Sequence, residues 1–155
     1  MKRTSKEKSF LDYSLFVAFF PQLIAGPIVH YSEVMPQFSS MENKKFISKN
    51  FSIGIFIFTL GLFKKVILAD TFSSFATPGF DEIQDLHFFL SWGTSLSYAF
   101  QLYFDFSGYS DMAIGLGRMF GFRFPKNFNH PYAAINMQEF WRRWHISLST
   151  WFRDY

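Results

Sequence analysis

LHFFLSWGTSLSYAFQLYF, residues 86–104, is the stretch that decides the fold. It carries no formal charge and approaches the roughly 20 residues that a helix needs to cross a bilayer. The stretch therefore predicts a membrane-spanning helix. Residues 51–69 form a second apolar run of comparable length, with Lys64 and Lys65 in its last third. Those lysines must reach an interface or meet an interior partner.

A third apolar run, residues 10–29, is interrupted by Pro21 and Pro27, which remove helix donors and predict a kinked or re-entrant helix. The basic residues ahead of it resemble a signal peptide, but no Ala-x-Ala pattern follows before His30, so we interpret the run as retained. The expected fold is all-α: a polytopic membrane protein with two or three spanning helices, the kinked or re-entrant helix and amphipathic interfacial helices. Residues 1–155 are expected to form a single membrane domain.

Composition supports an apolar environment and excludes several function classes. The 155 residues include 24 Phe, seven Tyr and four Trp, more aromatic surface than a domain of this size buries within itself. A lipid bilayer or a larger partner is implied. The absence of Cys excludes disulfides, thiolate nucleophiles and Cys-type metal sites. The basic residues flank apolar runs instead of forming one tract, which argues against nucleic acid as a partner.

The charges on either side of residues 86–104 predict an orientation. Acidic residues precede this segment, and basic residues follow it from Arg118 onward. Because Lys and Arg in short loops prefer the cytoplasmic side, the segment is expected to run from outside to inside. Residues 51–69 would then run in the opposite direction.

A histidine lies in the aromatic stripe of the last predicted helix. Asn136 followed by Glu139 matches a capping box, so a helix should begin there, with Glu139 and Arg143 as an i,i+4 pair. A helical projection of residues 136–155 gathers one side: Trp141, Trp144, His145, Leu148, Trp151, Phe152 and Tyr155. Desolvation among three tryptophans would keep His145 neutral near pH 7, as a base requires. The alternative is a core histidine bonded to a backbone carbonyl.

Two carboxylates lie in or after the apolar run that ends at Phe104. Asp105 shares a helix side with other polar residues, and at membrane depth this stripe must face an interior or a cavity. Asp111 points roughly the other way, which disfavours a shared metal ion. Pairing with Arg118, Arg123 or Arg142 is the expected role. Helix serines more often bond back to a carbonyl than act as nucleophiles, so Ser149 is a weak candidate for an acyl-enzyme.

Five long motifs follow one another along the chain: FFPQLIAGPIV (19–29), GLFKKVILAD (61–70), YFDFSGYSDMAIGLGRMFGF (103–122), PKNFNHPY (125–132) and EFWRRWHISLSTWFRDY (139–155). Together they resemble the membrane-bound O-acyltransferases, specifically the bacterial alginate O-acetyltransferase branch. This resemblance covers nearly the whole chain. It implies an enzyme that moves an acetyl group from acetyl-CoA, with no bound cofactor and no metal, to hydroxyls of an exported polysaccharide.

The resemblance also implies roles, partners and a location. His145 corresponds to the family's essential histidine and is expected to act as the base or to orient a substrate. Trp141, Trp144 and Asp105 are expected to bind substrate, and Arg142, Arg143 and Lys126 either bind the donor's phosphates or form a positive-inside flank. Such enzymes lie in the bacterial cytoplasmic (inner) membrane as multi-pass proteins and work with periplasmic acetyltransferase or esterase-like partners.

The same family pattern includes further helices ahead of the first motif and a second histidine downstream, so the chain is expected to be an incomplete domain. Two rival functions within the superfamily are D-alanyl transfer to teichoic acids and acetyl transfer to peptidoglycan. A rival of another class is a non-catalytic membrane scaffold or permease fragment. In that case the aromatic stripe would pack helices and the polar groups would line a solute path.

Overall fold

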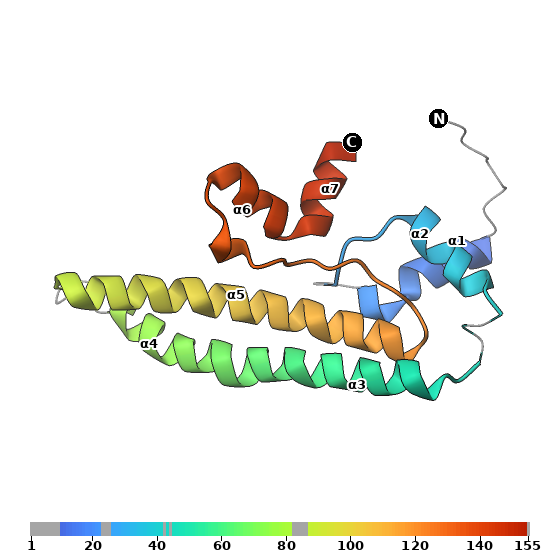
Figure 1. Cartoon of the computed structure of the whole chain (residues 1–155), viewed down its shortest axis with the longest axis horizontal. Coiled ribbons are helices and arrows are strands. Elements are labelled where there is room, and N and C mark those ends of the chain that lie inside the picture. Colours follow the sequence, from blue (N-terminus) through green and yellow to red (C-terminus); the bar gives the residue numbers. More distant parts are fainter. Residues whose placement is uncertain (1–9, 23–25, 42, 44, 82–86, 155) are drawn as a thin grey trace.

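The computed structural model describes residues 10–22, 26–41, 43, 45–81 and 87–154, and the regular elements among them are all helical (Figure 1). The predicted all-α class is confirmed. In chain order the elements are α1 (Phe10–Ala18), the 3-10 helix η1 (Phe20–Gln22), α2 (Tyr31–Ser39), α3 (Ser48–Phe63), the π-helix η2 (Lys64–Ala69), α4 (Asp70–Asp81), α5 (Phe88–Met119), the 3-10 helix η4 (Pro131–Ala133), α6 (Met137–Arg143) and α7 (Ile146–Asp154).

One helix within the described residues is long and apolar enough to cross a membrane. It is the continuous 34-residue helix Ser48–Asp81, made of α3, η2 and α4, and its most apolar 18-residue window has a mean hydropathy of 1.9. The neighbouring α5 has 32 residues but does not meet the same requirement, because polar and glycine residues interrupt its apolar side chains. The predicted apolar stretch 86–104 lies largely within α5, which continues to Met119 and so includes Asp105 and Asp111. The number of spans stays a prediction.

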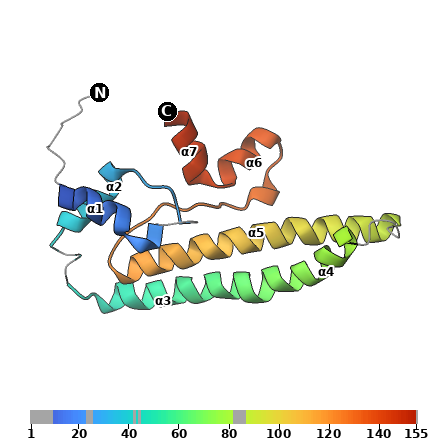
Figure 2. The ribbon, with the colours of Figure 1, turned by 180° about the vertical axis from the view of Figure 1, so that it is seen from behind.

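Glycines allow the two long helices to pack closely side by side and antiparallel (Figures 1 and 2). A Cβ atom on Gly61 would lie 2.5 Å from the carbonyl oxygen of Gly108, and one on Gly115 would lie 2.7 Å from that of Gly54. Both distances are too short for a real side chain. The pairs Gly54/Gly115 and Gly61/Gly108 therefore set the separation of α3 and α5, as small residues do in membrane helix pairs.

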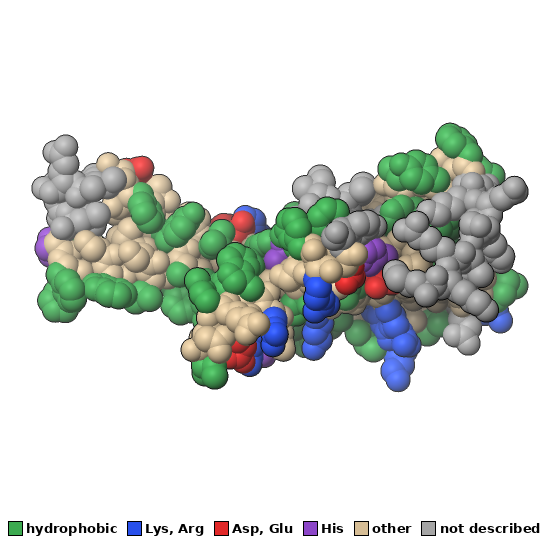
Figure 3. Space-filling model, turned by 90° about the horizontal axis from the view of Figure 1, so that it is seen from above, with side chains coloured by type: hydrophobic (Ala, Val, Ile, Leu, Met, Phe, Trp, Pro, Cys, Tyr) green, Lys and Arg blue, Asp and Glu red, His purple; other side chains and the backbone are tan. Residues whose placement is uncertain are grey.

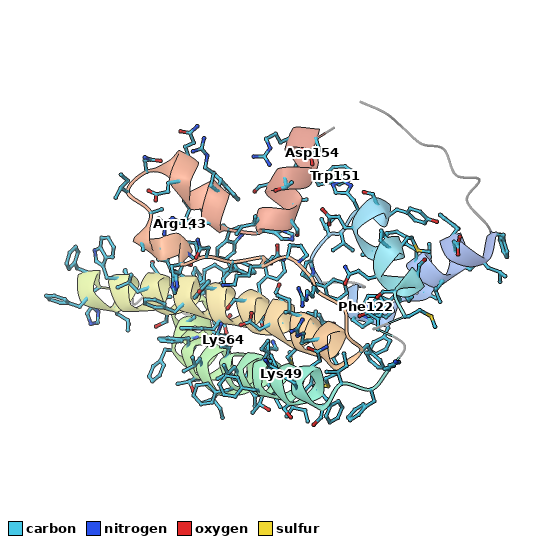
Figure 4. The ribbon with its side chains drawn as sticks, turned by 45° about the vertical axis from the view of Figure 1, so that its right-hand side comes forward. Lys49, Lys64, Phe122, Arg143, Trp151 and Asp154 are labelled. Carbon is cyan, nitrogen blue, oxygen red and sulfur yellow. The ribbon has the colours of Figure 1, made fainter. Side chains whose placement is uncertain are left out.

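The two lysines in the apolar helix meet carboxylates of α5. Lys64 Nζ lies 2.6 Å from Asp111 Oδ2, and Lys65 pairs with Asp105. Of the two expected alternatives, an interface or an interior partner, both lysines therefore take the second. Lys64 lies where the helix changes from α3 to η2 (Figure 4). The prediction that arginines pair with Asp105 and Asp111 is wrong. The π-helix η2 packs against α5 and places Lys64 and Lys65 beside these carboxylates.

The predicted break in residues 10–29 is confirmed. The helix α1 is only nine residues long, η1 contains Pro21, and Pro27 lies in an extended segment before α2. Residues 1–9, which carry the signal-like start, and residues 23–25 lie outside the described part of the chain. The break brings Phe19 against Phe122 at 4.6 Å between ring centroids, so this segment packs beside the end of α5. Its expected re-entrant path stays a prediction.

Many large apolar side chains of the described residues are exposed, and several groups of them lie on the face shown in Figure 3. Phe56 and Phe63 of α3 are at least half exposed, as are Phe89 and Trp92 at the start of α5. Extensive exposed apolar surface is typical of proteins that contact a membrane or another protein. The composition argument for lipid or further protein around these helices is therefore supported by their exposure.

Candidate active site

The predicted single helix over residues 136–155 is wrong, because it is interrupted at the histidine. Trp144 has an extended backbone (φ −99°, ψ 128°), and His145 has a left-handed one (φ 43°). A left-handed residue cannot continue a right-handed helix, so α6 ends at Arg143 and α7 begins at Ile146. The expected stripe of aromatic residues is consequently split between two helices, and its last member, Tyr155, lies outside the described residues.

The start of α6 follows the predicted capping pattern. Asn136 Oδ1 accepts a hydrogen bond of 2.8 Å from the backbone N–H of Glu139. The Glu139 carboxylate accepts from the N–H of Ile135, one residue before the expected donor, and pairs with Arg143 as predicted. The hydrogen bond from Ile135 and the Arg143 guanidinium lower the pKa of Glu139 below its usual value. These contacts fix α6, and with it the residue before the break.

The imidazole of His145 is half-buried against α5. Its ring centroid lies 4.8 Å from that of Phe106, at an interplanar angle of 69°. Desolvation lowers the pKa of His145 below 6.5, so the predicted preference for the neutral form is confirmed. The expected setting among three tryptophans is wrong, because the helix break leaves Trp141 56% and Trp151 38% exposed. Phe106 takes their place.

Trp144 forms the centre of an aromatic cluster beside the histidine. Its ring stacks on Phe140 at 5.6 Å and meets Phe128 edge-on at 5.0 Å. The remaining rings around it are those of Tyr103, Phe106 and Tyr132. The Tyr132 hydroxyl donates to the carbonyl of Ala99 at 2.7 Å, and burial raises the pKa of Tyr132. The cluster thus joins α5, the 127–129 segment, η4 and α6 into one support.

Residues 127–129 hold the break from both sides. The N–H of Ile146 donates to the carbonyl of Asn127 at 2.8 Å, and the N–H of Asn129 donates to the carbonyl of Arg143 at 2.9 Å. Asn127 Oδ1 also accepts from the N–H and hydroxyl of Ser147, at 3.2 and 2.8 Å. Sequence reasoning missed Asn127, because periodicity does not reveal a polar side chain buried in a loop. The available signal was its place in the PKNFNHPY motif.

The other predicted site residues surround this centre with different degrees of restraint. Asp105 is paired with Lys65 and directly precedes Phe106, while Arg143 is held by Glu139. Figure 4 labels Arg143 at the end of α6, near the break. Ser149 donates its hydroxyl to the carbonyl of Trp141 at 3.0 Å, so the expected bond back to a carbonyl is confirmed.

Two concavities lie elsewhere on the described surface. One, of about 390 Å³, is lined by residues of α4 and by Tyr98 of α5. The other, of about 650 Å³, includes Lys49, Arg118 and Arg123 among its lining residues. Neither is lined by His145. Among the described residues, no group of three or more His, Asp and Glu side chains is placed to hold a metal ion.

A long apolar helix, charges paired inside a helix pair, and a desolvated histidine at a helix break define an all-helical membrane protein with a candidate acid–base site. The chain belongs to the MBOAT, membrane-bound O-acyltransferase family, whose model matches residues 2–155. This family membership places the protein in a membrane.

Curated relatives cover almost the whole chain. It is 60% identical over 146 residues to the peptidoglycan O-acetyltransferase of Helicobacter pylori, covering 94% of this chain and 28% of that protein. It is 49% identical over 152 residues to the probable alginate O-acetylase AlgI of Pseudomonas putida, covering 98% and 30%. It is 34% identical over 160 residues to the teichoic acid D-alanyltransferase of Streptococcus thermophilus, covering 97% and 37%. The chain thus spans only 28 to 37% of the length of these relatives.

Proposed function

We propose that this chain carries part of the catalytic region of an O-acyltransferase that moves an acetyl group from acetyl-CoA to a hydroxyl of an exported polysaccharide. The observation that carries the proposal is the His145 imidazole, which is desolvated against Phe106 and held at a break between two helices. A neutral imidazole near pH 7 suits the removal of a proton from an alcohol. Membership of the family supports acyl transfer as the reaction.

In this reaction the acceptor oxygen attacks the thioester carbonyl, forming a C–O bond while the C–S bond breaks. The hydroxyl proton passes to a ring nitrogen of His145, and the thiolate leaves and is protonated. The developing oxyanion needs hydrogen-bond donors near the carbonyl. His145 acts as the base in this scheme. The alternative is that His145 orients the acceptor or the donor carbonyl while another group takes the proton.

The remaining predicted site residues have assigned parts in the proposal. Arg142 and Arg143 bind the donor's phosphates through charge-assisted hydrogen bonds, together with Lys126. Trp144 and Trp141 border the acyl site. Asp105 binds substrate at the same site, since it directly precedes Phe106 in α5. The alternative for the arginines is a cytoplasmic flank that only orients the chain.

The acceptor is a glycan of the bacterial envelope. Five relatives named as probable alginate O-acetylase AlgI, 47 to 49% identical to this chain, favour an alginate-like polymer. The 60% identity to a peptidoglycan O-acetyltransferase favours peptidoglycan as the second candidate. Either acceptor lies outside the cytoplasm, so the full protein is proposed to be a multi-pass protein of the bacterial inner membrane. Periplasmic acetyltransferase or esterase-like proteins would act with it.

The test uses the full-length enzyme in membranes with its periplasmic partners, labelled acetyl-CoA, and alginate or peptidoglycan as acceptor. We expect transfer of label to one glycan and its loss in His145→Ala, with normal membrane insertion. His87→Ala is the matched control, because His87 is the N-cap of α5, about five helical turns before Phe106, and its loss should leave transfer intact. Wild-type turnover in His145→Ala contradicts the proposal. Solute movement without any use of acetyl-CoA would favour the permease alternative.

A further inference from the structure

His145, which carries the proposed chemistry, has a backbone conformation that residues other than glycine seldom adopt. His145 is left-handed, which is uncommon for a residue other than glycine and is maintained only where the surroundings determine it. Its side chain also stands at the start of α7, whose first N–H groups lack partners within the helix. Contacts from outside the helix must therefore hold both the turn and the first residues of α7.

Asn127 supplies these contacts from 20 positions earlier in the chain. Its carbonyl accepts from the N–H of Ile146, and its side-chain oxygen accepts from the N–H and hydroxyl of Ser147. The residue therefore takes the part that a local N-cap side chain usually plays. Asn127 is 1% exposed, so water does not compete for these bonds.

Asn127 is in turn attached to α5. Its side-chain N–H donates to the hydroxyl of Ser110 at 3.2 Å, and Ser110 is 1% exposed. Phe106, the ring that lies against His145, is one helical turn before Ser110 and so shares its side of α5. The same face of α5 thus supports the imidazole through Phe106 and supports its backbone through Ser110 and Asn127.

Ser147 extends the connection to the segment before α2. Its hydroxyl accepts a hydrogen bond of 3.0 Å from the N–H of Ile28, while it donates to Asn127. The start of α7 is therefore fixed by α5, by the 127–129 segment and by the segment that follows Pro27. A displacement of any one of these would move His145.

We propose that Asn127 is a positioning residue for acyl transfer, which caps α7 from outside and thereby fixes the place of the His145 imidazole. This inference rests on the proposed function, since it concerns the same histidine. Asn127 touches no reacting atom in this scheme. It acts through Ser147, Ile146 and the left-handed turn.

The first test compares Asn127→Ala with Asn127→Asp in the full-length enzyme. Alanine removes every side-chain bond, so we expect kcat to fall about 10- to 100-fold while the KM for acetyl-CoA stays within about twofold. Aspartate keeps the acceptor oxygen for Ser147, and Ser110 can donate to its second oxygen because a hydroxyl is both donor and acceptor. We therefore expect Asn127→Asp to retain kcat within about fivefold of wild type.

The second test uses two serines of α5 with equal burial. Ser110→Ala removes the anchor of Asn127 and should lower kcat about fivefold or more. Ser107→Ala is the matched control, because Ser107 is 2% exposed and its hydroxyl has no hydrogen-bond partner within the described residues. It should leave kcat unchanged. This pair decides the question if Asn127→Ala yields too little folded enzyme.

Two results would overturn the inference: equal kcat losses in Asn127→Ala and Asn127→Asp, or equal kcat in Ser110→Ala and Ser107→Ala. His145→Ala, measured in parallel, separates this failure from failure of the proposed function. Wild-type turnover in His145→Ala rejects the function itself. An inactive His145→Ala beside a fully active Asn127→Ala rejects only the positioning role.

Discussion

Lys64 Nζ lies 2.6 Å from Asp111 Oδ2, near the middle of the apolar helix Ser48–Asp81. The next residue, Lys65, pairs with Asp105. Consecutive residues of an ordinary α-helix point about 100° apart. Both lysines lie in η2, a π-helix, which has more residues in each turn, so the angle between neighbouring side chains is smaller and both can face α5. The local change in helix type and the two ion pairs are therefore connected features.

Removing one member of the Lys64–Asp111 pair should cost more than removing both. Lys64→Met leaves an unpaired carboxylate in apolar surroundings, and we expect a loss of about 1–2 kcal/mol in the free energy of unfolding. The double variant Lys64→Met/Asp111→Leu should recover most of it. Thermal unfolding of the full-length protein in detergent measures both. Additive losses would show that the two charges do not interact.

The glycine pairs give a second prediction about the same helices. Gly61→Ala places a methyl group 2.5 Å from the carbonyl oxygen of Gly108, so we expect a loss of about 1–3 kcal/mol as α3 and α5 move apart. Gly93→Ala is the control, because a Cβ atom at Gly93 meets nothing within 4 Å. Its better helix propensity should leave stability equal or slightly higher. Equal losses at both positions in chemical unfolding would contradict close packing at Gly61.

Local patterns account for the parts of the fold that the sequence predicts correctly. The Asn136 cap, the Glu139–Arg143 pair and the break near Pro21 all depend on residues a few positions apart. The turn at His145 depends instead on hydrogen bonds from Asn127, and helical periodicity continues through it without any visible signal. A projection of one continuous helix therefore predicts tryptophans as the neighbours of the imidazole. In the structure, tertiary packing places Phe106 there instead.

The activity should fall in acid at a pH below the usual titration range of histidine. A base must be neutral, so transfer is present above the pKa of His145 and is lost as the pH falls through it. Burial lowers that pKa below 6.5, which moves the loss to lower pH. Phe106→Ala exposes the imidazole, so the acid limb of kcat/KM against pH should move up, toward the ordinary pKa of histidine.

Phe104→Ala is the control for this shift. It removes a ring of the same size from α5, but Phe104 stacks on Phe72, at 5.9 Å between ring centroids, and not on His145. Its pH profile should match that of the wild type. Burial of His145 should also make the folded protein less stable in acid. The unfolded chain binds a proton at His145 more readily, so the free energy of unfolding falls as the pH falls. An acid limb that is unchanged in Phe106→Ala would show that this ring does not set the titration of the base.

Arg142 and Arg143 are expected to differ in their response to charge reversal, although they are neighbours in α6. Arg143 is already paired with Glu139, whereas the ion pairs found among the described residues do not involve Arg142. Arg142→Glu should therefore raise the KM for acetyl-CoA about tenfold through lost phosphate contacts, with kcat nearly unchanged. Arg143→Glu should also destabilise α6, because it places two carboxylates one turn apart.

Arg123→Glu is the matched charge control, since Arg123 lines the concavity that also includes Lys49 and Arg118. Steady-state kinetics with acetyl-CoA as the varied substrate compare the three reversals. If the donor's phosphates bind at α6, Arg123→Glu leaves the KM unchanged. An increase in KM with Arg123→Glu and none with Arg142→Glu would move the donor site to that concavity. Equal, unchanged KM values in all three would leave the arginines of α6 with the role of a cytoplasmic flank.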